Sequence, residues 1–312
     1  MPSAESSPAP FLRQVALANG LSKHRLDGPA YHQLFGSVRV SAQRQLTPDV
    51  LARAALLIVP GAAVSHHSAA QLHRGIVPED PLTHLTVSTA RERRRREGLM
   101  VHVGGDRDVV RHEALRVTTP AQTFCDLADH LALVDLVVFG DSLVQRGKVD
   151  PTTLREAAGA KATGARARAR RAAELVRPGS ESPMETRVRL LLLMAGLPEP
   201  VINISIGDAE RTYRLDLSYP ELRFAIEYDG RQHAEDAAQW GHDVGRREWL
   251  DDRQWRLLVL RATDVYDTPW ATVRKIGAIL ASRGYHKQLA LHPPQTFRQH
   301  FPGRPWNVGR SA

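Results

Sequence analysis

The chain has 312 residues, of which 42% are hydrophobic and 24% charged, proportions typical of a globular protein long enough for two domains. No stretch approaches the roughly 18 uninterrupted apolar residues of a membrane span, and the N-terminus lacks the basic start and apolar core of a secretory signal. We therefore expect a cytoplasmic protein without a membrane segment. The single Cys125 lies among apolar neighbours, which is typical of a core residue.

The positive charge is concentrated in the first half of the chain. Residues 1–177 carry a net charge of +7 and residues 178–287 a net charge of −2, within a total of +8. A basic region attracts phosphate groups, whereas a near-neutral region can hold an acidic site. The alternative interpretation is that the arginine-rich composition serves solubility alone.

Two short helices are predicted early in the chain. Thr47 is placed to cap a helix over residues 48–59, because the proline that follows it suits a first helical turn. Ser65 can cap a second short helix that ends at Gly75. The two helices should flank a tight turn.

Strands and a longer helix follow. Residues 84–88 and 99–103 have β character and flank a very basic loop, so we expect a basic hairpin there. Residues 121–146 have apolar side chains at helical spacing. Helix, turn, helix and basic hairpin are the order of elements in a winged helix.

The second half predicts a different order of elements. Residues 151–180 are rich in alanine and arginine and indicate a helical connector. The sequence beyond them predicts helix, three strands, helix and strand. From about His286 onward four prolines and weak periodicity predict an irregular or loosely docked tail.

Carboxylates gather on the two strands that flank Pro220. A tight hairpin there would place Asp216 opposite Ala225, with Glu227 as its diagonal neighbour. Period-two alternation then puts Asp216, Glu227 and Asp229 on one face of the hairpin and apolar residues on the other. Acidic groups this close repel one another unless a cation intervenes, and Mg²⁺ or Mn²⁺ is the natural partner of oxygen ligands.

An ordinary amphipathic hairpin explains the alternation equally well. In that interpretation Arg214 and Arg223 would neutralise the acids. We favour a site because Asp229 is followed closely by His233, which adds polar groups at the strand end where an α/β site usually opens.

These residues resemble a known family. Glu185 on a helix, Asp216 on a strand, the run Glu227-Tyr228-Asp229-Gly230 with His233, and then Asp243 and Arg247 on a helix look like the very-short-patch-repair-like endonucleases of the PD-(D/E)xK superfamily. The resemblance spans about residues 181–281. It implies that Asp216 and Glu227 hold the metal, that Glu185 is an outer metal or water contact, and that His233 or Arg247 contacts the phosphate.

The sequence departs from the superfamily at one position. Asp229 stands where the usual lysine would follow the second acid, so Arg247, His233 or Gln232 would have to take the role of that lysine. Glu185 also has a second interpretation, because Ser182 three residues before it completes a capping box.

Two runs of the upstream half, residues 46–75 and 116–128, resemble the winged helix of AbiEi-type antitoxins, and the resemblance covers roughly residues 10–146. The resemblance implies that the segment 65–74 approaches a DNA groove. It also implies that the arginines of the wing contact phosphates, namely Arg91, Arg93, Arg94, Arg95 and Arg96. We interpret the three histidines of the segment 65–74, His66, His67 and His73, as surface or capping residues, because no cysteine or second spaced cluster accompanies them.

The sequence therefore predicts an α/β protein with a restriction-endonuclease-like αβββαβ core and a mainly helical winged-helix domain. The expected parts are a DNA-binding region over 1–146, a basic helical connector over 147–180, a nuclease-like domain over 181–285 and a tail over 286–312. The expected activity is Mg²⁺- or Mn²⁺-dependent hydrolysis of DNA. The alternative is a non-catalytic regulator or antitoxin; a homodimer and a toxin partner both stay open.

Overall fold

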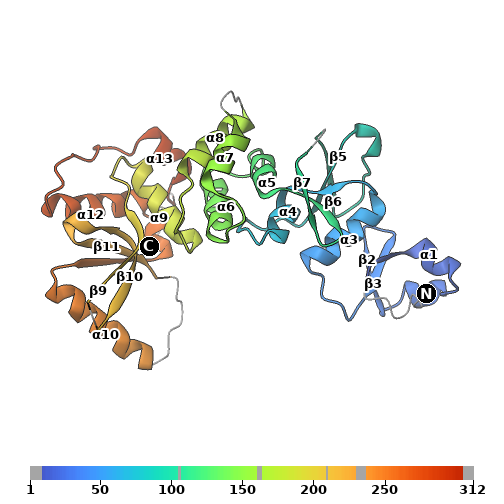
Figure 1. Cartoon of the computed structure of the whole chain (residues 1–312), viewed down its shortest axis with the longest axis horizontal. Coiled ribbons are helices and arrows are strands. Elements are labelled where there is room, and N and C mark those ends of the chain that lie inside the picture. The colour runs from blue at the N-terminus through green and yellow to red at the C-terminus, as the bar shows by residue number, and fades with distance from the viewer. Residues whose placement is uncertain (1–8, 105–106, 160–163, 209, 230–236, 305–312) are drawn as a thin grey trace, which may run out of the picture. The chain divides into compact units, whose positions relative to one another are not determined.

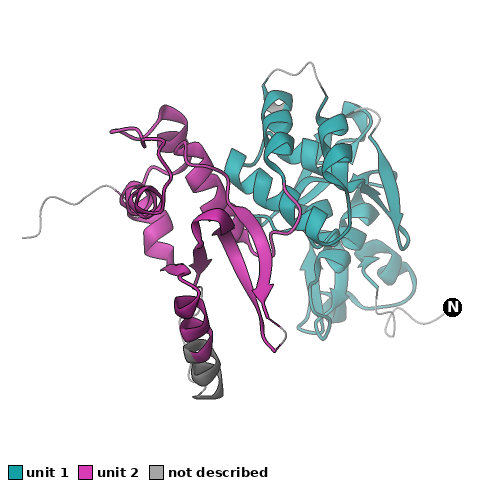
Figure 2. Cartoon of the chain, turned by 60° about the vertical axis from the view of Figure 1, so that its left-hand side comes forward, with its two compact units in different colours: residues 1–176 teal, residues 177–312 magenta. Residues whose placement is uncertain are grey.

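The computed structural model describes residues 9–104, 107–159, 164–208, 210–229 and 237–304, with side chains from residue 245 onward in the helix that begins at Ala237. The chain forms two compact units, residues 1–176 and 177–312 (Figure 2). Three sheets and many helices confirm the mixed α/β class. Among the described helices none is long and apolar enough to cross a bilayer.

The first unit begins with a small sheet of order β1-β3-β2. Its strands are β1 (Phe11–Leu12), β2 (Tyr31–Leu34) and β3 (Val38–Ser41), and the short helices α1 (Arg13–Ala18) and α2 (Lys23–Leu26) join β1 to β2. The side chain of Arg39 is buried, and it donates to a carboxylate oxygen of Asp27 over 2.8 Å and to the carbonyl of Leu26 over 2.9 Å. This arginine fixes the end of α2 against the sheet.

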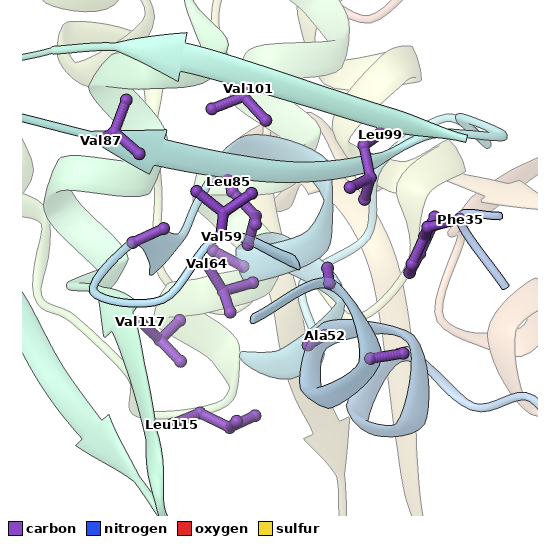
Figure 3. Packing of buried hydrophobic residues seen from close by; sticks show 14 of the residues in the cluster. Phe35, Ala52, Val59, Val64, Leu85, Val87, Leu99, Val101, Leu115 and Val117 are labelled. Carbon is purple, nitrogen blue, oxygen red and sulfur yellow. The ribbon is translucent and has the colours of Figure 1, made fainter. Parts of the chain in front are cut away.

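A five-stranded sheet of order β6-β5-β4-β8-β7 is the centre of the first unit. Its strands are β4 (Ala63–Val64), β5 (Thr83–Val87), β6 (Leu99–Val103), β7 (Val109–His112) and β8 (Leu115–Thr118). The helix α3 (Pro48–Ile58) packs on this sheet, and the cap by Thr47 is confirmed, since its hydroxyl accepts from the amide of Val50. Figure 3 shows side chains of β4, β5 and β8 meeting α3 in one apolar core.

The prediction that the two strands flanking the basic loop form a hairpin is wrong. β5 and β6 pair in parallel, with Thr83 opposite Leu99 and Val87 opposite Val103. A parallel pair needs a connection that runs back along the strands, and residues 88–98, with the short helix η1 (Ala90–Glu92), make that return. The basic loop is therefore a crossover and does not form the tip of a wing.

The helix α4 (His66–Leu72) is buried, which corrects two predictions. Gln71 is the one residue of α4 that is exposed, and the helix packs against α3, β5, β8 and α5. A recognition helix needs an open face for the DNA groove, so α4 does not have the surface expected of the segment 65–74. His66, His67 and His73 are also buried and are not surface residues. The first unit is mixed α/β: most of its regular structure is helical, as predicted, but it also holds two sheets that the prediction did not include.

Four helices complete the first unit: α5 (Pro120–Leu127), α6 (Leu133–Gln145), α7 (Pro151–Ala158) and α8 (Ala165–Leu175). The single helix predicted over residues 121–146 is interrupted at residues 128–132. Arg168 of α8 donates to the carbonyls of Ala128 and Leu131, over 2.6 and 3.4 Å, and satisfies polar groups left open by the break. The helical prediction for the alanine-rich segment holds for α7 and α8, which pack on α5 and α6.

The second unit has the expected order of elements from its first helix onward (Figure 1). The elements are α9 (Pro183–Met194), β9 (Val201–Gly207), β10 (Thr212–Tyr219), β11 (Phe224–Tyr228), α10 (Ala237–Asp252) and β12 (Arg256–Leu260). The sheet order is β12-β11-β10-β9, and β11 and β12 are parallel. α9 packs on β10 and β11, and α10 packs on β12.

The chain after β12 forms α11 (Ala262–Tyr266), α12 (Pro269–Ser282) and α13 (Gln295–His300). The prediction of an irregular tail is wrong for α13. Phe297 and Phe301, one helical turn apart, are buried, and the ring of Phe297 lies 5.3 Å from that of Trp270. Two aromatic anchors therefore hold α13 on the unit.

We expect the Gly140→Ala variant to be less stable than the Gly245→Ala variant. A Cβ at Gly140 on α6 would stand 2.5 Å from Val176, whereas a Cβ at Gly245 on α10 meets nothing within 4 Å. Both gain the helix propensity of alanine, but overpacking costs about 1–3 kcal/mol. Urea unfolding of both variants measures this difference. Equal stability of the two variants would contradict the prediction, because it would show that Val176 can move away from α6 at no cost in free energy.

Candidate active site

The β10–β11 hairpin has a different register from the one predicted. Tyr219 lies opposite Phe224, Ser218 opposite Ala225 and Leu217 opposite Ile226, so the prediction is wrong by two residues. The cause is the turn, where Pro220–Leu222 form the 3₁₀ helix η2 and Arg223 has a left-handed φ of 47°. A shift of two residues keeps each side chain on its face.

The new register brings Asp216 and Glu227 together. They are the next residues beyond the last pair, Leu217 and Ile226, so the two acids face one another across the strands and are not diagonal neighbours. The carboxylate of Asp216 accepts from the amide of Tyr228 over 3.2 Å. This bond ties the side chain of one strand to the end of the other.

Both acids open into a pocket of about 290 Å³ at the end of the hairpin. Its walls come from β10, β11, α10 and β12, and they combine acidic, basic and apolar side chains. The lining residues are Asp216, Glu227, Tyr228, Asp229, Arg246, Arg247, Leu257 and Val259. The structure therefore brings together four of the predicted site residues, Asp216, Glu227, Asp229 and Arg247.

Arg246 is a functional candidate that the sequence reasoning missed. Its guanidinium binds both carboxylate oxygens of Glu227, one of them over 3.1 Å, and donates to the carbonyl of Arg214 over 2.7 Å. The adjacent Arg247 is exposed at the pocket. Arginines side by side on a helix point in different directions, so the sequence alone does not indicate which one reaches the acid.

The charged form of Asp216 is disfavoured in the pocket. Burial raises the pKa of Asp216 above its ordinary value, and the nearby charge of Glu185 raises it further. The amide of Tyr228 and the guanidinium of Arg246 act in the opposite direction. A carboxylate in this position is stabilised in its charged form by any further cation.

Glu185 is a capping residue in this structure. Its amide donates to the hydroxyl of Ser182 over 3.1 Å, and its carboxylate accepts from the amide of Glu181 and from Asn203, each over 2.8 Å. The N-cap by Ser182 is thus confirmed, but the carboxylate of Glu185 reaches the amide of Glu181, one residue before the N-cap, and so does not complete the predicted capping box. Glu185 does not line the described pocket, although its charge reaches Asp216.

Of the two arginines of the alternative interpretation, Arg214 acts on Asp216 through its charge, which lowers the pKa of that carboxyl, but among the described residues neither arginine forms an ion pair with an acid of the pocket. Arg214 forms an ion pair with Glu181, and Arg223 donates to the side chain of Gln254 over 3.2 Å. Two residues expected at the site, Gln232 and His233, lie outside the described residues. Asp243 belongs to the part of α10 whose side chains are not described.

The donor set of the pocket fits Mg²⁺ only in part. Among the described residues, groups of three metal-ligating atoms within 4.8 Å occur elsewhere, in the first unit, and the pocket carboxylates do not form one. Mg²⁺ in proteins commonly takes one or two carboxylates, with waters and substrate phosphates completing its shell. Asp216 and Glu227 can supply those two carboxylates.

The predicted DNA-contacting arginines lie on the crossover between β5 and β6. Arg91, Arg93, Arg94, Arg95 and Arg96 are all exposed, and four of them border a shallow depression with Leu99 and Met100. Within the described part of the chain none of the five has a carboxylate within ion-pair distance. Their charge is therefore directed to solvent.

Comparison with known proteins gives distant relatives and no family. No family model matches the chain. The uncharacterized protein MT2308 of Mycobacterium tuberculosis strain CDC 1551 / Oshkosh is 26% identical over 234 residues, which cover 73% of this chain and 86% of the relative. The uncharacterized protein Rv2248 of strain ATCC 25618 / H37Rv matches with the same identity and coverage.

We expect Arg246→Ala to destabilise the second unit by about 1–3 kcal/mol at neutral pH, because it deprives the half-buried Glu227 of the guanidinium that binds both its oxygens. Arg246 also lowers the pKa of Asp216 in the folded state. Its attraction to the Asp216 carboxylate therefore stabilises the unit above that pKa and is lost as the pH falls through it. Urea unfolding at neutral pH and at about pH 4 should therefore show a smaller difference at the lower pH.

Arg304→Ala is the control for this experiment. Arg304 pairs with Asp267 but is 79% exposed, and removal of an exposed pair costs roughly 0–1 kcal/mol. A loss of stability equal in the two variants would contradict a special role for Arg246.

Proposed function

We propose that the second unit is a divalent-metal-dependent nuclease domain with a restriction-endonuclease-like core. The observation that carries the proposal is the meeting of Asp216 and Glu227 in one pocket with Asp229, Arg246 and Arg247. Carboxylates suited to a hard cation and arginines suited to phosphate are the two groups that phosphodiester hydrolysis requires. The α-β-β-β-α-β order of the unit supports the same proposal.

In this proposal each side chain has a separate task. Asp216 and Glu227 would hold Mg²⁺ or Mn²⁺, which supplies charge neutralisation at the scissile phosphate and an activated water. Arg247, exposed at the rim of the pocket, would bind a phosphate oxygen. Arg246 would keep Glu227 oriented, and its charge would compensate in part for the lysine that Asp229 replaces.

DNA would be held in addition by the arginines of the first unit. The five exposed arginines between β5 and β6 form a concentrated positive surface, and such a surface binds the backbone of a duplex without reading its sequence. Because α4 is buried, contact through this crossover replaces the groove contact expected of a recognition helix.

A second candidate function is a non-catalytic DNA-binding regulator or antitoxin. The observation that favours it is the pair of bonds between Arg246 and Glu227, since a guanidinium on both carboxylate oxygens competes with a metal ion. In this function the pocket would bind phosphate without cleaving the chain.

We expect Asp216→Ala and Glu227→Ala each to reduce Mg²⁺- or Mn²⁺-dependent nicking of plasmid DNA by at least about 100-fold. Each removes a carboxylate that would hold the ion, and loss of such a group costs several kcal/mol of transition-state stabilisation. The measurement is cleavage of supercoiled plasmid with each ion and with chelator.

Glu221→Ala is the matched control, because Glu221 is an exposed acid in the turn of the same hairpin. Its activity should equal that of the unmodified chain. Nicking that is unchanged in the two pocket variants would remove the nuclease assignment. Salt-dependent DNA binding without any cleavage would favour the regulator.

We expect replacement of the five crossover arginines by glutamine to weaken DNA binding and to flatten its salt dependence. Each arginine that no longer neutralises a phosphate should reduce the slope of log K against log salt by about 0.9. Fluorescence anisotropy with a labelled duplex over a range of salt concentrations measures this slope. Glutamine at the exposed Arg256 and Arg274 is the control, and equal slopes in both variants would exclude the crossover as the binding surface.

A further inference from the structure

A cluster of histidines lies in the first unit, and none of its members lines the pocket of the second unit. His66 and His67 come from α4, His84 from β5, His102 from β6, and His130 from the chain after α5. In the pairs of rings that contact one another, the centroids are 3.6 to 6.1 Å apart. Because these segments are far apart in the sequence, the fold itself assembles the cluster.

Asp80, in the loop between α4 and β5, faces two of these rings. Its Oδ1 lies 3.2 Å from Nε2 of His84, and its Oδ2 lies 3.7 Å from Nδ1 of His67. Neither of these two buried nitrogens forms a hydrogen bond of good geometry within the described structure. The amide of Leu82 donates to Asp80 over 2.8 Å and holds the carboxylate in this position.

We propose that His67, Asp80 and His84 form a binding site for a divalent transition-metal ion of the Zn²⁺ class. Their three ligand atoms lie within 4.8 Å of one another. A tetrahedral ion with bonds of about 2.0–2.2 Å sets its ligand atoms roughly 3.3–3.5 Å apart. The 3.2 Å between Oδ1 of Asp80 and Nε2 of His84 is close to this range, and the ligand atom of His67 lies within 4.8 Å of the other two, so a small movement of the His67 side chain completes the site.

His102 has the role of an outer residue that orients the ligand His84. Nε2 of His102 lies 3.0 Å from Nδ1 of His84, on the side of the ring opposite Asp80. A hydrogen bond to the second ring nitrogen fixes the tautomer and the direction of a ligating imidazole. With His84 Nδ1 engaged by His102, Nε2 is the nitrogen that faces the ion.

A second group, His66, His84 and His102, also has close ligand atoms but a less suitable geometry. The rings of His66 and His102 are stacked, with centroids 3.6 Å apart and an angle of 15° between planes. A lone pair of imidazole lies in the ring plane, so stacked rings cannot direct their nitrogens to one point. Nδ1 of His66 also contacts the hydroxyl of Ser65 over 2.9 Å.

The protonation states suit a metal site. Burial lowers the pKa of His67 and of His84 below the ordinary value, which keeps both rings in the neutral form that binds metals. Burial opposes ionisation of Asp80, but the Leu82 amide and His84 outweigh it and lower the pKa of Asp80. Two neutral imidazoles and one carboxylate leave a fourth position for water or a further ligand.

The test is Zn²⁺ binding by the full-length chain in excess Mg²⁺, which occupies oxygen-ligand sites. Equilibrium dialysis with metal analysis should give one tightly bound Zn²⁺. Asp80→Asn, His67→Ala and His84→Ala should each weaken this binding by more than about 100-fold, because each removes a ligand. His102→Ala removes an outer residue and should weaken it by roughly 10–100-fold. His32→Ala, at an exposed histidine of β2, should bind as tightly as the unmodified chain.

Asp80→Asn keeps the shape of a partly exposed side chain, so it should remove the ligand without unfolding the chain. Far-UV circular dichroism checks that the variant is folded. Bound Co²⁺ should give the intense visible absorption of a four-coordinate ion, and Asp80→Asn should abolish it. Absence of tight Zn²⁺ binding overturns the proposal. Binding that survives Asp80→Asn but is lost in His66→Ala also overturns it, because the ion would then occupy the stacked group.

Discussion

The burial of two carboxylates, Asp216 and Glu227, in one pocket is the constraint on which the charge balance of the second unit depends. Two carboxylates held face to face in a partly buried pocket are tolerable only when positive charge or hydrogen-bond donors accompany them. Arg246 reaches Glu227 from α10, the amide of Tyr228 reaches Asp216, and Glu185 is confined to its cap at the start of α9. The position of α10 beside β12 thus serves two purposes: the helix packs on the sheet, and it brings the charge of Arg246 to the acids of the hairpin.

The sequence predicted those features that arise from local rules. The cap at Thr47, the order of elements in the second unit and the placement of Asp216 and Glu227 on one face follow from capping chemistry and hydrophobic periodicity, although the predicted register of the hairpin was wrong by two residues. It did not predict the parallel pairing of β5 with β6, because strand direction depends on a return path that no residue pattern records. The sequence likewise did not show that Arg246, and not Arg247, binds Glu227, because this depends on how α10 is oriented about its own axis.

The burial of the histidines was missed for a related reason. A polar residue on a short helix ordinarily faces water, and nothing near His66 or His67 in sequence reveals that β5 and β6 supply partners. The two polar centres of the chain differ in chemistry. The pocket of the second unit offers oxygen ligands and arginines, whereas the cluster of the first unit offers imidazoles, so under the two proposals the pocket would favour a hard cation and the cluster a borderline one.

The turn between β10 and β11 has a consequence for how such a hairpin can vary. Because η2 and the left-handed Arg223 set the register, the number of residues in the turn decides whether Asp216 meets Glu227. A change of one residue would move one acid to the opposite face, and a change of two would separate the acids along the strands. The length of this turn is therefore part of the pocket, and position 223 must hold a residue that tolerates a left-handed φ.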